Sequence, residues 1–90
     1  MKEYTDYHFE DMNGFVRVFD GEHINTNEMD WHRDKKDRVV TILDSGDDWY
    51  FQFDNGLPFK MTPGISIIVK KDMYHRVHKG NDDLVVKIQE

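Results

Sequence analysis

Short runs of β-branched and aromatic residues, each closed by glycine, asparagine or aspartate, recur along the chain. They include "FVRVFD" (15–20), "RVVTIL" (38–43), "WYFQF" (49–53), "ISIIVK" (65–70) and "LVVKIQ" (84–89). About seven short strands at intervals of roughly 8–12 residues, with turn residues between them, are typical of an all-β sandwich or barrel. No window keeps a helical period for more than about two turns. The pattern therefore predicts an all-β fold.

Three segments carry more specific expectations about their place in the sheets. "ISIIVK" (65–70) is the most apolar and is predicted to be a central strand. Pro58 in "LPFKM" (57–61) restricts that segment to an edge, a strand start or a bulge. The N-terminal "MKEYTDYHFEDM" fits either a short helix or an edge strand, and the sequence leaves both open.

The composition suits one small folded domain over residues 1–90. Of the 90 residues, 38% are hydrophobic and 13% aromatic, so a few large rings supply most of the core. There is no cysteine, so a metal site would have to use nitrogen and oxygen ligands. No apolar run approaches the ~18 residues of a membrane span, and we expect a cytoplasmic protein without membrane contact.

The net charge of −6 argues against a nucleic-acid-binding role, because phosphate backbones attract basic surfaces. Two basic clusters, within 33–38 and 70–79, are interpreted as solvated edges. The same acidic balance argues against binding to an anionic membrane surface.

The segment "PGISIIVKKDMYHRVHKGN" (63–81) has a distinctive order of residue types. A glycine in a turn is followed by a strand, a charged turn and a histidine at the head of the next strand. This order resembles the second motif of the cupin superfamily, and Gly64 and His75 match it at the right spacing. Lys70 and Asp72 replace its proline and second glycine, and Asn81 comes two positions later than the motif's asparagine.

The segment "DWHRDKKDRVVTILDSG" (30–46) is similar to the first cupin motif. Asp30 and His32 stand where the motif has His-x-His, and Asp37 stands where it has a glutamate. Gly46 comes two positions late, which leaves open whether Asp37 points into the barrel. The residues 33–36 between these positions are interpreted as a solvated connection. The alternative interpretation is that His32 and its acidic neighbours form only a surface pair.

The resemblance implies a small antiparallel double-stranded β-helix, the cupin-like jelly-roll barrel, with metal in its mouth. Asp30, His32, Asp37 and His75 are then the metal ligands. Residues two apart on an extended segment share a face, so Asp30 and His32 can point the same way. Imidazoles with carboxylates suit iron, manganese, nickel or zinc, and the sequence does not choose among these divalent metals. The isolated His23 is a weaker candidate for the barrel lining.

Polar side chains on the strands are candidates for lining a ligand pocket. Alternate residues of "WYFQF" face opposite sides, so Tyr50 and Gln52 could line a pocket, together with Thr41. The reverse arrangement, with the phenylalanines facing inward, is equally compatible with the alternation.

Three functions are consistent with these features. Cupin-like proteins include metal-dependent dioxygenases, isomerases and decarboxylases that act on small molecules. A metal-free module that binds a small ligand is the second possibility, favoured by the departures from both motifs. The third is a structural block that forms a homodimer. Whether the chain is an enzyme is left open by the sequence, because a fold does not fix a chemistry.

Overall fold

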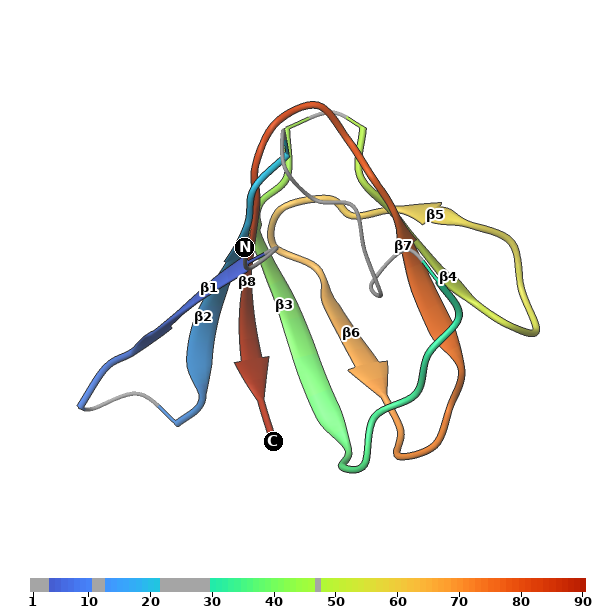
Figure 1. Ribbon diagram of the computed structural model, residues 1–90, viewed down its shortest axis with the longest axis horizontal. Coiled ribbons are helices and arrows are strands. Elements are labelled where there is room, and N and C mark those ends of the chain that lie inside the picture. The colour runs from blue at the N-terminus through green and yellow to red at the C-terminus, as the bar shows by residue number, and fades with distance from the viewer. Residues whose placement is uncertain (1–3, 11–12, 22–29, 47) are drawn as a thin grey trace.

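Two antiparallel sheets face each other in the computed structural model, which describes residues 4–10, 13–21, 30–46 and 48–90 (Figure 1). The strands are β1 (Tyr4–His8), β2 (Phe15–Phe19), β3 (Arg38–Asp44), β4 (Tyr50–Phe53), β5 (Phe59–Lys60), β6 (Ser66–Val69), β7 (His75–His78) and β8 (Leu84–Gln89).

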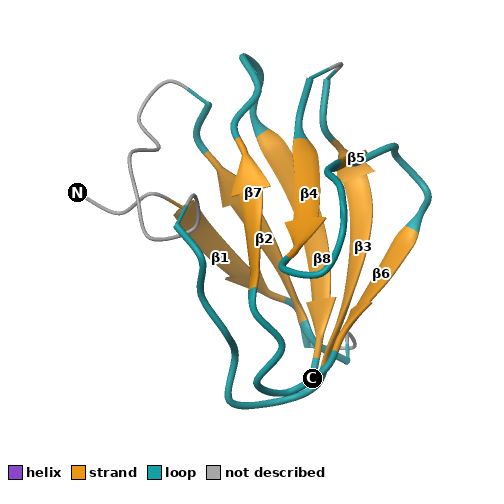
Figure 2. Cartoon of the chain, turned by 90° about the vertical axis from the view of Figure 1, so that its right-hand side faces the viewer, coloured by secondary structure: helices purple, strands orange, loops and turns teal. Residues whose placement is uncertain are grey.

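The chain passes between the sheets in the manner of a jelly roll. One sheet has the strand order β1-β2-β8-β3-β6 and the other has the order β5-β4-β7. After β3 the chain crosses to β4 and β5, returns to β6, crosses again to β7 and ends in β8. Figure 2 shows β4 and β7 lying across from the strands of the larger sheet. The predicted all-β jelly-roll fold is therefore confirmed.

The part of the chain that the structure describes contains no α-helix (Figure 2), and thus no helix with the length and hydropathy to span a membrane.

The hydrophobic core fills the space between the two sheets. Strands β2 and β8 each bury every second residue, which is the alternation that places one face of a strand against a core. Trp49 is fully buried just before β4, and its ring lies 6.3 Å from that of Phe19 on the opposite sheet. The other buried apolar residues are Phe15, Phe19, Ile42, Phe51, Met61, Ile67, Val69, Val77, Leu84, Val86 and Ile88.

Of the three segment predictions, the one for "ISIIVK" is wrong. Its strand β6 lies at an edge of the larger sheet, next to β3 alone, and Ile68 on its outer face is 61% exposed. The central strand is β8, which pairs with β2 and β3. The segment after Pro58 forms the edge strand β5, as predicted, and the N-terminal segment forms the edge strand β1 rather than a helix.

Gly14 is the glycine whose replacement should cost most in the fold. Its φ is +121°, and a Cβ there would lie against the backbone carbonyl of Ile88 on β8. We expect Gly14→Ala to lower the free energy of unfolding by about 2 kcal/mol or more, from backbone strain and steric overlap together. Urea unfolding measures this change. Gly56→Ala is the control, because nothing lies within 4 Å of the added Cβ, and it should change stability by no more than about 0.5 kcal/mol. Equal stability of the two variants would show that a Cβ at position 14 causes neither the strain nor the overlap expected here.

Candidate metal centre

His32 and His75 lie directly opposite each other on neighbouring extended segments. The amide of His32 donates to the carbonyl oxygen of His75 at 3.0 Å, and the amide of His75 donates to that of His32 at 2.8 Å. Residues paired in this way carry their side chains on the same face. The two imidazole rings accordingly meet edge to face, with centroids 4.3 Å apart. Since His75 begins β7 and is 5% exposed, this shared face is the interior of the barrel.

A backbone carbonyl fixes the orientation of each imidazole ring. Nδ1 of His32 lies 2.9 Å from the carbonyl oxygen of Asp30, and Nδ1 of His75 lies 2.8 Å from that of Met73. A carbonyl oxygen can only accept a hydrogen bond, so Nδ1 carries the hydrogen and the lone pair of the neutral ring is on Nε2. This outer hydrogen bond is the usual companion of a histidine that binds a metal through its other nitrogen.

Asp34 supplies a carboxylate to the same place. It follows His32 by two residues on an extended segment and so projects from the same face. One of its oxygens lies 3.5 Å from Nε2 of His75, and its side chain is 16% exposed. Ligand atoms of His32, Asp34 and His75 all lie within 4.8 Å of one another. The structure thus gathers two imidazoles and one carboxylate at a single point.

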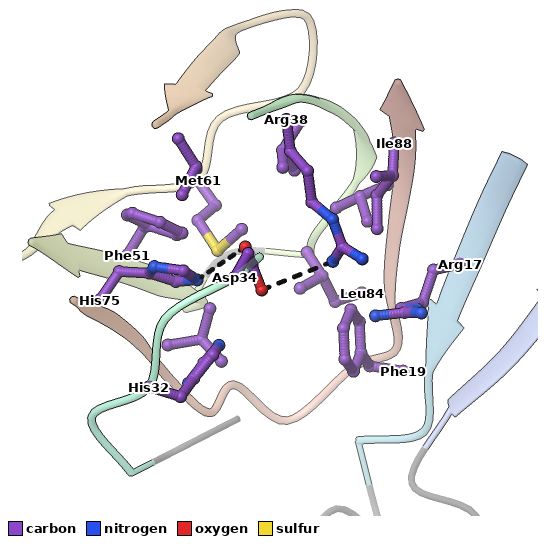
Figure 3. A pocket seen from close by; sticks show the side chains of 14 residues that line it. Arg17, Phe19, His32, Asp34, Arg38, Phe51, Met61, His75, Leu84 and Ile88 are labelled. Carbon is purple, nitrogen blue, oxygen red and sulfur yellow. Dashed lines mark ion pairs between the residues drawn. The ribbon is translucent and has the colours of Figure 1, made fainter. Parts of the chain in front are cut away.

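These three side chains border a cavity between the two sheets, with a volume of about 50 Å³. Figure 3 draws the two imidazoles on one side of Asp34 and the guanidinium groups of Arg17 and Arg38 on the other. The second carboxylate oxygen of Asp34 lies 3.7 Å from Nη1 of Arg38. The remaining wall is apolar and includes Phe51, whose ring stacks on His75 at 5.4 Å.

Two of the four predicted metal ligands, Asp30 and Asp37, are not in this cluster. Asp30 is exposed, and its backbone carbonyl rather than its side chain is directed at His32. The carboxylate of Asp37 accepts the amide of Lys71 at 2.7 Å and so ties the start of β3 to the turn after β6. Asp34, interpreted from the sequence as part of a solvated connection, takes the acidic position instead. His23 lies outside the described residues.

The predicted pocket residues Thr41, Tyr50 and Gln52 face outward and do not line the cavity. On β4 the buried residue is Phe51, so its two neighbours point to the opposite side. The Gln52 side chain accepts hydrogen bonds from Arg76 and His78 on the outer face, and the Thr41 hydroxyl lies 2.9 Å from that of Ser66. On β4 the phenylalanine Phe51 faces inward, which is the arrangement that the sequence left open as the alternative.

Three polar residues of the cavity were not predicted from the sequence. The face-sharing rule that pairs Asp30 with His32 applies equally to Asp34 on the other side of that histidine. Arg17 shares one face of β2 with Phe15 and Phe19, so the strand pattern places its side chain inward, although a charged residue is rarely assigned to a core face. Nothing in the sequence indicated that the side chain of Arg38 points into the cavity.

The donor set fits a divalent transition metal. Two imidazoles and one carboxylate on one side of an ion, with other positions left for water or a ligand, form the arrangement known from non-haem iron enzymes, and it also suits manganese, nickel or zinc. The ligand atoms come from one short loop and one strand, and backbone hydrogen bonds hold both.

The two-sheet jelly roll with a histidine–aspartate cluster in its cavity defines the chain as a protein with the cupin fold. Three crystal structures are similar to it. The protein NMB1881 from Neisseria meningitidis has a TM-score of 0.61 and 20% identity, over 98% of this chain and 86% of that one. A cupin domain from Bordetella pertussis has a TM-score of 0.57 and 21% identity, over 99% of this chain and 96% of that one.

The third structure is a cupin-like protein from Thermotoga maritima, with a TM-score of 0.57 and 14% identity, over 94% of this chain and 63% of that one. No protein-family model and no curated protein sequence matches the chain. At these identities the structural likeness shows the fold, and the function has to be argued from the site.

Proposed function

We propose that the protein binds one divalent transition metal through His32, Asp34 and His75 and holds a small molecule beside it. The observation that carries this proposal is the convergence of three ligand atoms within 4.8 Å, inside a cavity and with both imidazoles oriented by backbone carbonyls. A chance group of surface side chains would lack both the burial and the orientation.

The cavity supports the second half of the proposal. Its wall is largely apolar, with a few polar groups gathered at one place, which is the usual make-up of a small-ligand site. A bound metal would supply Lewis acidity or a centre for redox chemistry. The chain itself contributes orientation through the pair of histidine–carbonyl bonds, and it keeps bulk water away through buried apolar side chains of the cavity wall such as Phe51, Val69 and Leu84.

The proposal is tested by titrating the metal-depleted protein with Ni²⁺ in a calorimeter, alongside elemental analysis. We expect one ion per chain, and we expect His75→Ala to lower the affinity by about 100-fold or more, beyond the range seen when a supporting residue around a metal is lost. His32→Ala should behave in the same way. His78→Ala is the matched control, because it removes a histidine from the same strand on the outer face. It should leave the affinity unchanged.

The outcome that would overturn the proposal is a protein whose stability and metal content do not respond to nickel or to a chelator. In that case the contacts of Asp34 with His75 and Arg38 would be a metal-free polar network. The cavity would then serve the predicted alternative, a binding module without metal.

A further inference from the structure

The wall of the cavity opposite the histidines is positively charged. Arg17 and Arg38 both line it, and the guanidinium group keeps its charge at any physiological pH. Among the described residues that line the cavity, Asp34 is the single acidic one. A divalent ion on Asp34 would add two positive charges beside these guanidinium groups.

Contacts from outside the cavity hold both arginines in place. Arg17 on β2 makes a two-point pair with Asp6 on the neighbouring strand β1, at 2.8 and 3.1 Å, and its guanidinium carbon lies 3.8 Å from the ring centre of Tyr4. Arg38 on β3 makes its short contacts, at 2.9 and 3.0 Å, with Glu90. Neither Asp6 nor Glu90 lines the cavity. The guanidinium groups are therefore positioned before any ligand arrives.

The contact between Arg38 and Asp34 is the one that metal binding would loosen. At 3.7 Å it is long for an ion pair, and it uses the carboxylate oxygen that is not directed at His75. A divalent ion bound to Asp34 would repel the guanidinium group of Arg38, and this repulsion would offset part of the attraction between Arg38 and Asp34. Nη1 of Arg38 would then face the space beside the metal.

We infer that the ligand of the metal-loaded cavity is a small monocarboxylate, with its carboxylate between the metal and the guanidinium groups of Arg17 and Arg38. This inference rests on the proposed metal site. The planar guanidinium group matches a carboxylate in shape and charge. A volume of about 50 Å³ suits a body of roughly two to four carbons, and the apolar remainder of the wall suits an alkyl chain.

The test is calorimetric titration of the nickel-loaded protein with acetate, with acetamide as the neutral analogue of the same shape. We expect acetate to bind at least tenfold more tightly than acetamide. Arg38→Met and Arg17→Met should each weaken acetate binding at least tenfold, and neither should weaken nickel binding, because each removes a positive charge that repels the ion. Arg33→Met is the control, because Arg33 is exposed beside Tyr74 and does not line the cavity.

The possible results distinguish a failure of the proposed metal site from a failure of the carboxylate assignment. Nickel binding that depends on His75, together with equal binding of acetate and acetamide, overturns this inference and leaves the proposed function in place. Absence of nickel binding overturns both. Tighter binding of inorganic phosphate than of acetate overturns the assignment to a carboxylate. If Arg17→Met does not fold, Arg17→Lys replaces it, because lysine keeps the positive charge but cannot make two parallel hydrogen bonds to one carboxylate. Unchanged acetate binding in both Arg17→Lys and Arg38→Met would also overturn the inference.

Discussion

Asp34→Asn is expected to weaken the binding of a divalent metal by roughly a thousandfold. A carboxylate about 2.1 Å from a doubly charged ion contributes about 4 kcal/mol of attraction even at the dielectric constant of water, and an amide lacks that charge. Asparagine keeps the size and shape of aspartate, so the fold should survive. Calorimetric titration with Ni²⁺ measures the affinity, and circular dichroism checks that the variant is folded.

Asp37→Asn and Asp30→Asn are the matched controls for this experiment. Both remove a carboxylate from the same segment, and both positions correspond to ligands in the alignment with the first cupin motif. Because Asp37 binds the amide of Lys71 and Asp30 is exposed, we expect nickel affinity to stay within about threefold in each. Loss of nickel in Asp37→Asn, with retention in Asp34→Asn, would show that the motif alignment is right and that the ligand set proposed from the geometry is wrong.

The fold was predictable from the sequence because it depends on patterns of period two and on turn residues. The alternation in "FVRVF" and "LVVKIQ" marks β2 and β8 correctly as strands with one buried face. The error on β6 has a physical cause. A run such as "ISIIV" contains apolar residues at both alternating positions, so it reads as buried on both faces, although its outer residues, such as Ile68, are exposed at an edge.

The candidate site was predictable only in part. The two histidines were singled out by the resemblance, and the structure brings them together through a backbone pair that links residues far apart in the chain. The carboxylate of the proposed metal site was expected at Asp30 and Asp37, because the motif spacing was followed through a loop whose direction the sequence does not set. Thr41, Tyr50 and Gln52 were assigned to the wrong face, since an alternating strand fixes its two faces but not which one is inside. The homodimer and the cytoplasmic location stay predictions.

The second large effect is expected at Trp49, the largest fully buried side chain among the residues that the structure describes. Trp49→Ala should lower the free energy of unfolding by about 3–5 kcal/mol, from lost apolar burial and the cavity left behind. The indole Nε1 donates to the carbonyl oxygen of Asp82 at 2.6 Å, and loss of this bond should add about 1 kcal/mol. A folded chain of this length has a total stability of only about 5–13 kcal/mol, so between about a third and all of this stability would be lost.

Trp31→Ala is the matched control, because it removes the chain's other tryptophan from a surface position. Trp31 is 41% exposed, and its ring contacts Arg76 at 4.4 Å, an interaction worth about 0.5–1 kcal/mol at an exposed site. Urea unfolding and thermal unfolding, both followed by far-ultraviolet circular dichroism, compare the two variants without depending on tryptophan fluorescence. The melting temperature should fall by more than about 15 °C in Trp49→Ala and by only a few degrees in Trp31→Ala. Similar losses in the two variants would mean that the aromatic centre between the sheets does not dominate the stability of this fold.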